Sequence, residues 1–302
     1  MTDQGRRAAP EGVLPVDKPE GPTSHDVVSR VRRALGTRAV GHTGTLDPFA
    51  SGLLLVCVGP ATRLAEYITG LPKTYVATLR LGTATDTDDL TGEVIGGSDE
   101  WRGVTRERID AALQAQVGTT LQLPPLFSAK KVDGERMYAA ARRGEAVERK
   151  PSTVTIHGIR LIGMELPDVE FEVECGAGTY IRAIARDAGE RLGVGGHLRT
   201  LRRTRVGPHS VERAVPLGLL DDAERVAAAI LSPLEAVAHL PRAVVDDDGL
   251  AALRFGRALE APDDVPAGGP VAIASAGGSL LAIGERIGGV LQPRKVFVGG
   301  GG

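Results

Sequence analysis

The sequence predicts a two-domain α/β protein that is rich in sheet and ends in a small β module. The chain has 302 residues, about twice the ~150 that one domain usually takes. Its 40 glycines and 19 prolines imply many turns, which suit a sheet better than a helical bundle. Hydrophobic residues at 42% and charged residues at 25% are globular values, so wholesale disorder is excluded.

The first 82 residues predict strands and helices in alternation. Val27, Val28, Val31 and Leu35 recur with helical spacing. The segment GHTGTLDPFASG predicts a loop, because its glycines, proline and small side chains leave little to bury. In order, we expect a strand over 12–19, a helix from a cap at Thr23 or Ser24 to Gly36, a loop over 41–52, a strand over 53–58, a helix beginning at Gly59-Pro60 and a strand over 75–82.

The rest of the chain predicts further strands and helices and then the β module. Phe171, Val173 and Cys175 alternate with three glutamates, as in a half-buried strand. In order, we expect a loop over 83–103, a helix over 105–117, a basic helix around 137–143, strands over 154–163 and 169–175, a helix over 178–192, a basic strand over 197–206, and a small β-barrel over 242–298 with strands at 271–275 and 280–283. We expect residues 1–11 to be disordered and the last glycines to fray.

Several classes of protein are excluded by what the sequence lacks. Two cysteines, Cys57 and Cys175, are too few for a disulfide framework or a four-thiolate zinc site. Neither a P-loop, a Rossmann fingerprint nor an HExxH motif occurs, and the TDTDD run lacks the glycine and distal glutamate of a calcium loop. The longest apolar run, 53–58, is too short for a bilayer, and no signal peptide is recognisable. We therefore expect a cytoplasmic protein with no cofactor, no metal and no membrane contact.

The charge is unevenly distributed. The formal net charge is −2, but residues 1–210 hold 28 basic and 26 acidic side chains, whereas residues 211–302 hold 8 and 12. Four arginines lie in the acid-free stretch 30–38, and seven lie between 182 and 205. Such arginine clusters suit phosphate oxygens, although a solvated charged face is an equally good reading of charge alone.

Three positions carry candidate chemistry. Asp47, between a Gly/Thr loop and Pro48, could be a nucleophile, a base or an Asx turn, and taken alone the turn is the commoner case. Tyr180 and Arg182 open a helix after a strand; they share a side only if that stretch is extended. Tyr75 lies in an alternating strand and could be either a site residue or a core residue.

Six segments, in order and spacing, carry a resemblance to a known family: VDKPEGPTSHDVV, GHTGTLDPFASGLL, KTYVATLRLGTATDTDDLTGEV, PPLFSAKKVDGERMYAAARRG, GTYIRAIARDAGERLG and GGHLRTLRRTRVG. Over residues 12–215 the chain resembles the TruB family of tRNA pseudouridine synthases. The resemblance implies an α+β fold: a mixed, mostly antiparallel sheet flanked by helices, with a small C-terminal PUA-like β module. It implies a catalytic domain over 12–234, in which 124–150 closes on RNA, and the PUA-like module over 235–302.

The resemblance also assigns residues to the site. Asp47 would be the catalytic nucleophile, Tyr75 would stack on the base and could act as general base, and Arg182 would pair with Asp47 and keep it ionised. The residues expected to bind or surround the substrate are His42, Lys18, Tyr180, Leu201, Arg202 and Arg203.

The implied reaction converts uridine-55 in the T loop of tRNA to pseudouridine without a cofactor. The base is flipped out, its N-glycosidic bond is broken with the help of the aspartate, and the base is rejoined through carbon. Whether the carboxylate attacks ribose C1′ or uracil C6 stays open at this point. The implied partner is tRNA through its T arm, bound by a monomer. The alternatives are a tRNA-folding chaperone or RNA-binding module without catalysis and, less favoured, an aspartate-dependent hydrolase of small anions.

Overall fold

The computed structural model describes residues 11–127, 131–132, 135–136 and 149–298, which belong to two compact units. The first unit comprises residues 1–47, 53–69 and 207–302, and the second comprises 48–52 and 70–206. The expected basic helix around 137–143, nearly all of the N-terminal segment and the final glycines lie outside the described residues, as does most of the expected RNA-closing segment 124–150.

In the first unit, short strands and helices surround the strand β1. Its elements outside the C-terminal sheet are β1 (Gly12–Lys18), α1 (Ser24–Leu35), β2 (Val40–His42), β3 (Ser51–Val58, shared with the second unit), η1 (Gly59–Leu64), α2 (Ala65–Thr69), β13 (His209–Ser210), η3 (Val211–Arg213), β14 (Val215–Pro216), η4 (Leu217–Leu219), α6 (Ala223–Ala229) and α7 (Pro233–Ala236). Strand β1 lies between β14, to which it is parallel, and β3, which is antiparallel to β2. Helix α1 begins and ends as expected: Thr23 and Asp26 form a capping box, and Gly36 adopts the left-handed conformation that stops it.

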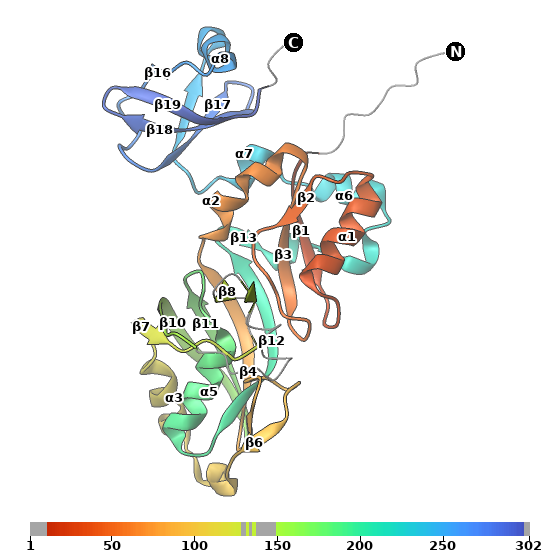
Figure 1. Cartoon of the computed structure of the whole chain (residues 1–302), viewed down its shortest axis with the longest axis vertical. Helices are drawn as coiled ribbons and strands as arrows, with labels where there is room; N and C mark the ends of the chain where they lie inside the picture. The colour runs from red at the N-terminus through yellow and green to blue at the C-terminus, as the bar shows by residue number, and fades with distance from the viewer. Residues whose placement is uncertain (1–10, 128–130, 133–134, 137–148, 299–302) are drawn as a thin grey trace. The chain divides into compact units, whose positions relative to one another are not determined.

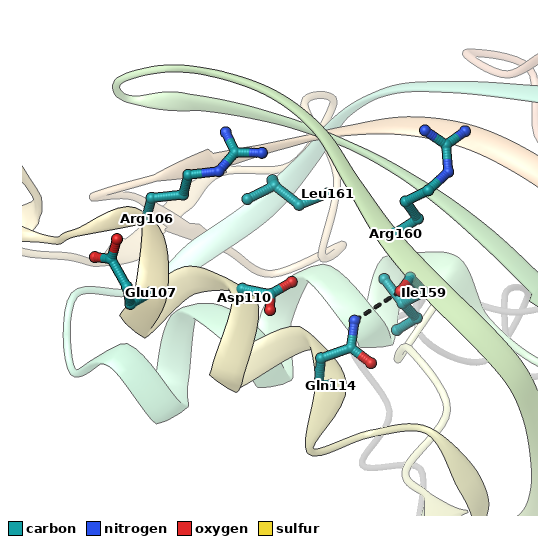
Figure 2. A pocket seen from close by; sticks show the side chains of 7 residues that line it. All are labelled: Arg106, Glu107, Asp110, Gln114, Ile159, Arg160 and Leu161. Atoms are coloured by element: carbon teal, nitrogen blue, oxygen red, sulfur yellow. Dashed lines mark hydrogen bonds between the residues drawn. The ribbon is translucent and has the colours of Figure 1, made fainter.

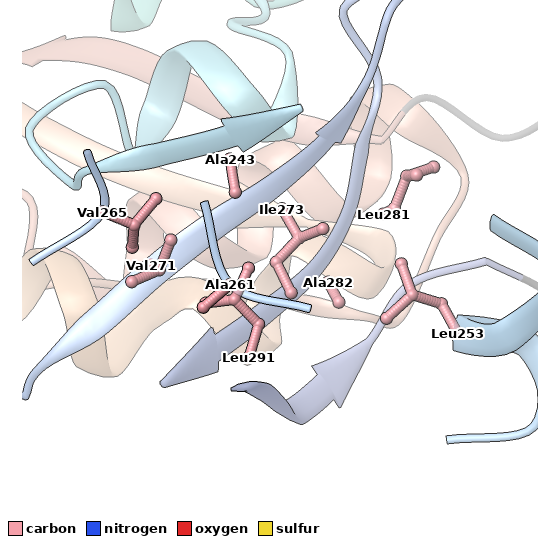
Figure 3. Close-up of a cluster of buried hydrophobic side chains, with 9 residues drawn as sticks. All are labelled: Ala243, Leu253, Ala261, Val265, Val271, Ile273, Leu281, Ala282 and Leu291. Atoms are coloured by element: carbon pink, nitrogen blue, oxygen red, sulfur yellow. The ribbon is translucent and has the colours of Figure 1, made fainter. Parts of the chain in front are cut away.

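The first unit also contains a five-stranded sheet with its own core, which confirms the expected C-terminal β module. Its elements are β15 (Arg242–Val245), α8 (Asp247–Arg254), β16 (Leu259–Glu260), β17 (Pro270–Ser275), β18 (Leu280–Ile287) and β19 (Val290–Val296), with the strand order β15-β17-β18-β19-β16. Figure 3 shows the apolar cluster of this sheet, in which Ile273 and Leu291 are fully buried. Next to it, Arg63 of η1 lies 4.9 Å from the ring centre of Phe297, and Lys295 pairs with Glu66 of α2.

The second unit is an antiparallel sheet with two helices packed against it and against each other (Figure 1). Its elements are β4 (Lys73–Leu81), β5 (Ala84–Thr85), β6 (Val94–Gly96), η2 (Asp99–Gly103), α3 (Arg106–Gln114), β7 (Gly118–Gln122), β8 (Lys131–Val132), β9 (Glu135–Arg136), β10 (Ser152–Glu165), β11 (Asp168–Cys175), α5 (Ile181–Leu192) and β12 (Gly196–Val206). The strand order is β12-β4-β11-β10-β7. The start of β3, at Ser51 and Gly52, pairs with β12 in parallel. The sheet is therefore mixed and mostly antiparallel, as expected.

Three stretches differ from the sequence-based expectation. Residues 83–103 are not all loop, since the pair β5–β6 and the turn η2 form within them. The helix expected from residue 178 begins only at Ile181, because Gly178 has a φ of 86° and Tyr180 is extended. The helix expected at Gly59 starts as the 3-10 turn η1. Within the ranges described, no helix has the length and apolarity needed to cross a membrane.

Candidate active site

One face of the β4–β12 pair gathers three of the expected site residues. Tyr75 lies directly opposite Arg203, and Ala77, two residues along β4, lies opposite Leu201. Directly opposed residues share a face of the sheet, so Tyr75, Arg203 and Leu201 are neighbours on it. All three are buried, with 7%, 2% and 6% of their surfaces exposed. An arginine buried on the same face as a tyrosine is unusual for a purely structural face, because arginine is almost never fully buried unless it is paired.

Lys73 lies on the same face as Tyr75, two residues earlier on β4, and no sequence signal pointed to it. It is also buried and donates a hydrogen bond of 2.7 Å to the carbonyl oxygen of Leu71. Burial, and after it the positive charge of Arg203, lower the pKa of Lys73 to about 8. Two basic side chains, those of Lys73 and Arg203, therefore lie on the same face of the sheet as Tyr75.

Arg202 and Arg203 lie on opposite faces of β12. Arg202 is half-buried and pairs in register with Val76 on one side and Ser51 on the other, whereas Arg203 is buried opposite Tyr75. The parallel contact with β3 requires a glycine at position 52, since a Cβ there would lie 2.2 Å from the carbonyl oxygen of Arg203. The two adjacent arginines therefore have different surroundings and different access to solvent.

Arg182, in the first turn of α5, donates to acceptors in two other segments of the second unit. Its Nη1 donates to the carbonyl oxygen of Thr87 at 3.1 Å and to Oδ2 of Asp89 at 3.2 Å. Its Nη2 donates to the carbonyl oxygen of Phe127 at 3.0 Å. The side chains of Arg182 and Asp89 are only 6% and 5% exposed, so this is a buried ion pair. Breaking such a pair from one side costs about 3–5 kcal/mol, which fixes the guanidinium in place.

Asp89 is the centre of a tightly bonded loop in the TDTDD run, whose sequence lacks the pattern of a calcium loop. Its Oδ1 accepts hydrogen bonds from the hydroxyl of Thr87, at 2.8 Å, and from the amide and hydroxyl of Thr91, at 2.9 and 2.6 Å. The loop is attached to β12, because Leu198 donates to the carbonyl oxygen of Asp88 and accepts from the amide of Leu90. The signal that could have found Asp89 is the pattern of threonines spaced two residues on each side of it.

The start of α5 is fixed by a second contact. The amide group of the Gln122 side chain pairs with the backbone of Tyr180, accepting from its N–H at 2.8 Å and donating to its carbonyl oxygen at 3.1 Å. Gln122 is buried, and Tyr180 itself is half-buried at the N-cap position in an extended conformation. Tyr180 is therefore extended, whereas Arg182 is already helical. The expectation that both residues lie in one extended stretch holds only for Tyr180.

The remaining expected site residues lie in the first unit. Asp47 is half-buried and follows Leu46, whose backbone is bound from both sides by the hydroxyl of Ser24: the hydroxyl accepts from the Leu46 N–H at 2.8 Å and donates to its carbonyl oxygen at 3.1 Å. His42, at the end of β2, accepts from the Gly44 N–H through Nδ1 at 3.3 Å. Lys18 is fully buried and donates to the carbonyl oxygens of Pro19 and Pro22.

The arginines of 30–38 divide into two groups. Arg30 pairs with Asp221 at 3.4 Å, and Arg32 donates to the carbonyl oxygen of Val40 at 2.9 Å, so both have partners within the first unit. Arg33 and Arg38 are exposed. Part of this cluster is therefore structural, and part is accessible to a ligand.

A hollow on the second unit contains none of the expected site residues in its lining. It lies between α3 and β10, as Figure 2 shows, and is lined by Arg106, Glu107, Asp110, Gln114, Ile159, Arg160 and Leu161. Gln114 closes one side by donating to the carbonyl oxygen of Ile159 at 2.7 Å. In the parts of the chain that the structure describes, no group of three His, Cys, Asp or Glu side chains is arranged to hold a metal ion.

Two family models together match most of the chain, and curated relatives match nearly all of it. Residues 32–181 match the family model described as "TruB family pseudouridylate synthase (N terminal domain)", and residues 182–238 match "tRNA pseudouridylate synthase B C-terminal domain". A relative from Arthrobacter sp. (strain FB24), named tRNA pseudouridine synthase B, is 45% identical over 298 residues, covering 95% of this chain and 96% of the relative. One of the same name from Thermobifida fusca (strain YX) is 45% identical over 300 residues, covering 96% and 99%.

Solved structures are similar over nearly the whole chain. An H/ACA RNP bound to a substrate RNA containing 2′-deoxyuridine includes a chain that matches with a TM-score of 0.75 and 29% identity, covering 96% of this chain and 86% of that one. A Cbf5-Nop10-Gar1 complex includes one with a TM-score of 0.75 and 32% identity, covering 96% and 85%. With these matches in sequence and fold, the chain belongs to the TruB family of pseudouridylate synthases.

Proposed function

We propose that the chain converts uridine-55 in the T loop of tRNA to pseudouridine, with Asp47 as nucleophile. The single observation that carries the assignment of residues is the buried face on which Tyr75 lies beside Leu201 and Arg203. The relatives named tRNA pseudouridine synthase B support tRNA as the substrate. The matching chain in the RNA-bound complex supports a nucleic-acid ligand for this fold.

Chain connectivity supports the inclusion of Asp47. Ser51 is hydrogen-bonded in register with Arg202 of β12, and Asp47 precedes Ser51 by only four residues. Asp47 therefore directly precedes the segment 48–52, which belongs to the same compact unit as Tyr75 and pairs with β12. Arg182 would keep this carboxylate ionised, since a cation close to an aspartate lowers its pKa.

In the proposed reaction each residue has a distinct task. The flipped uracil stacks on Tyr75, which returns about 1–3 kcal/mol of the cost of unstacking it. Leu201 excludes water, and the Asp47 carboxylate attacks either ribose C1′ or uracil C6. The N1–C1′ bond breaks, the base turns, C5 bonds to C1′, and the bond to the carboxylate is broken again. Tyr75 then takes the C5 proton. His42 would help to hold the T loop of the tRNA, Lys18 would support the site, and Tyr180 would line it. Arg202 would contact the RNA.

Tritium release from uracil C5 tests this proposal. Unmodified tRNA carrying tritium at C5 of uridine should lose one tritium to water per tRNA when the protein is present, and none with Asp47→Asn. Asp47→Asn should still bind tRNA, because the substitution keeps the shape of the side chain. Wild-type protein that binds tRNA without releasing tritium would favour a chaperone or binding module instead. Release by Asp47→Asn at the wild-type rate would remove Asp47 as nucleophile.

We also propose that residues 235–302 act as a separate module beside a catalytic domain of residues 12–234. The apolar cluster of the five-stranded sheet, which runs in sequence from Ala243 to Leu291, supports this division. The monomeric state, the T-arm contact and the cytoplasmic location remain predictions of the sequence.

A further inference from the structure

Arg186 is a mostly buried arginine that the proposed reaction does not use. It follows Arg182 by four residues on α5, so it lies one turn further along the same side of the helix. Its Nη1 donates to Oδ2 of Asp88 at 2.8 Å, its Nη2 to the carbonyl oxygen of Leu123 at 2.9 Å, and its Nε to Oδ1 of Asp187 at 2.8 Å. The Arg186 side chain is 13% exposed and that of Asp88 is 9% exposed.

The two arginines bind the same two segments. Arg182 contacts Asp89 in the loop and Phe127 in the segment after β7, and Arg186 contacts Asp88 and Leu123 in the same two places. Each guanidinium therefore bridges the loop and the segment, one helical turn apart. The acceptors of Arg182 cannot move far while the Arg186 bridge is intact.

Asp88 combines an uncommon backbone conformation with a buried carboxylate. It is the one non-glycine residue with a positive φ, 61°, among the residues described, and aspartate is one of the few side chains that tolerate this conformation. Burial raises the pKa of Asp88, and the positive charge of Arg186 opposes that rise. Without Arg186 the buried Asp88 carboxylate would lose the cation that lies 2.8 Å from it. An unpaired buried charge is costly, so the loop would shift to expose this carboxylate to water.

We propose that Arg186 is a positioning residue for Arg182: it holds the loop and the segment that carry the acceptors of the Arg182 guanidinium. The proposal rests on the proposed function, in which Arg182 acts on Asp47. Arg186 would act by orienting the Arg182 guanidinium, and a small misplacement of such a group can lower the reaction rate by up to about 100-fold.

Single-turnover tritium release, with enzyme in excess over tRNA, tests this directly. Arg186→Gln should slow the rate constant by about 10- to 100-fold while the Kd for tRNA stays within about twofold. Arg186→Lys, which keeps the charge beside Asp88 but cannot form the forked contacts, should lie between that variant and wild type. Arg191→Gln removes the same charge from the exposed last turn of the same helix and should match wild type. Rates are compared per folded molecule, at a temperature well below the Tm of each variant.

A double-mutant cycle separates positioning from a merely structural role. If Arg186 acts through the acceptors of Arg182, Arg186→Gln should slow Asp89→Asn much less than it slows wild type. Equal factors in both backgrounds, or a lower Tm with an unchanged rate for both Arg186 variants, would overturn the proposal. If Arg186→Gln does not fold, the same criteria apply to Arg186→Lys. Wild-type protein that releases no tritium would overturn the proposed function and this proposal with it, whereas an active wild type with fully active Arg186 variants would overturn this proposal alone.

Discussion

Ser24→Ala should loosen Asp47 through a single deleted oxygen. The Ser24 hydroxyl makes the two hydrogen bonds, of 2.8 and 3.1 Å, that hold the Leu46 backbone, and both residues are only 3% exposed. Alanine would leave a buried N–H and a buried carbonyl oxygen without these bonds. An unsatisfied buried group costs about 1–3 kcal/mol. At roughly 2–4 °C per kcal/mol for a unit of this size, the Tm should fall by several degrees.

The catalytic consequence follows from the position of Leu46. It directly precedes Asp47, so its release would widen the range of positions of the carboxylate, and single-turnover tritium release at 25 °C should slow by about 10-fold or more. The helix itself should be unaffected, because the cap of α1 is formed by Thr23 and Asp26. Ser29→Ala, in the same helix, is the matched control and should change neither Tm nor rate. If Ser24→Ala behaves like this control, the hydroxyl does not anchor the loop and the reasoning fails.

Three other substitutions have defined outcomes. Asp89→Asn should lower both the Tm and the tritium-release rate, because it removes the charge of one member of the buried Arg182–Asp89 ion pair; unchanged thermal melting would contradict the ion pair. Burial lowers the pKa of His209, so the unfolded chain takes up its proton first as pH falls below about 6.5 and the free energy of unfolding should decrease; urea melts of His209→Gln should show less of this decrease, and an equal decrease would refute it. Arg205 is exposed, and Arg205→Ala should reduce the slope of log Kd against log salt by about 0.9, the contribution of one phosphate contact. Arg102 is also exposed, and Arg102→Ala should leave the slope unchanged.

The helices and strands were predictable where their signals are local. The first helix has a capping residue, apolar positions at helical spacing and a terminating glycine within fourteen residues, Thr23 to Gly36, and the structure has it at those positions. Alternation along β4 likewise placed Tyr75 on a buried face. Residues 83–103 were harder, because the β5–β6 pair has only two and three residues per strand, too few to show a period.

The site was predictable as a set of residues but not as a set of contacts. Arg182 and Asp89 are 93 residues apart, and neither strand alternation nor helical spacing relates positions so distant. The sequence also gave no reason to expect Arg203 below the surface, since arginine is almost never fully buried unless it is paired. Long-range partners of buried charges are set by the way strands and loops are brought together, and the local periodicity of a sequence does not reveal that arrangement.

The burial of arginines changes how the basic stretch 182–205 should be interpreted. Its seven arginines suggest a surface for phosphates, but Arg182, Arg186 and Arg203 are buried or nearly so and are therefore shielded from a bound backbone. Arg199 is paired with Asp168 at the surface. Fewer phosphate contacts remain than the charge count implies, and each contributes only about −0.9 to the salt slope. Much of the positive charge in this stretch is therefore used to fix the geometry of the site, and RNA binding depends on the minority of arginines that remain exposed.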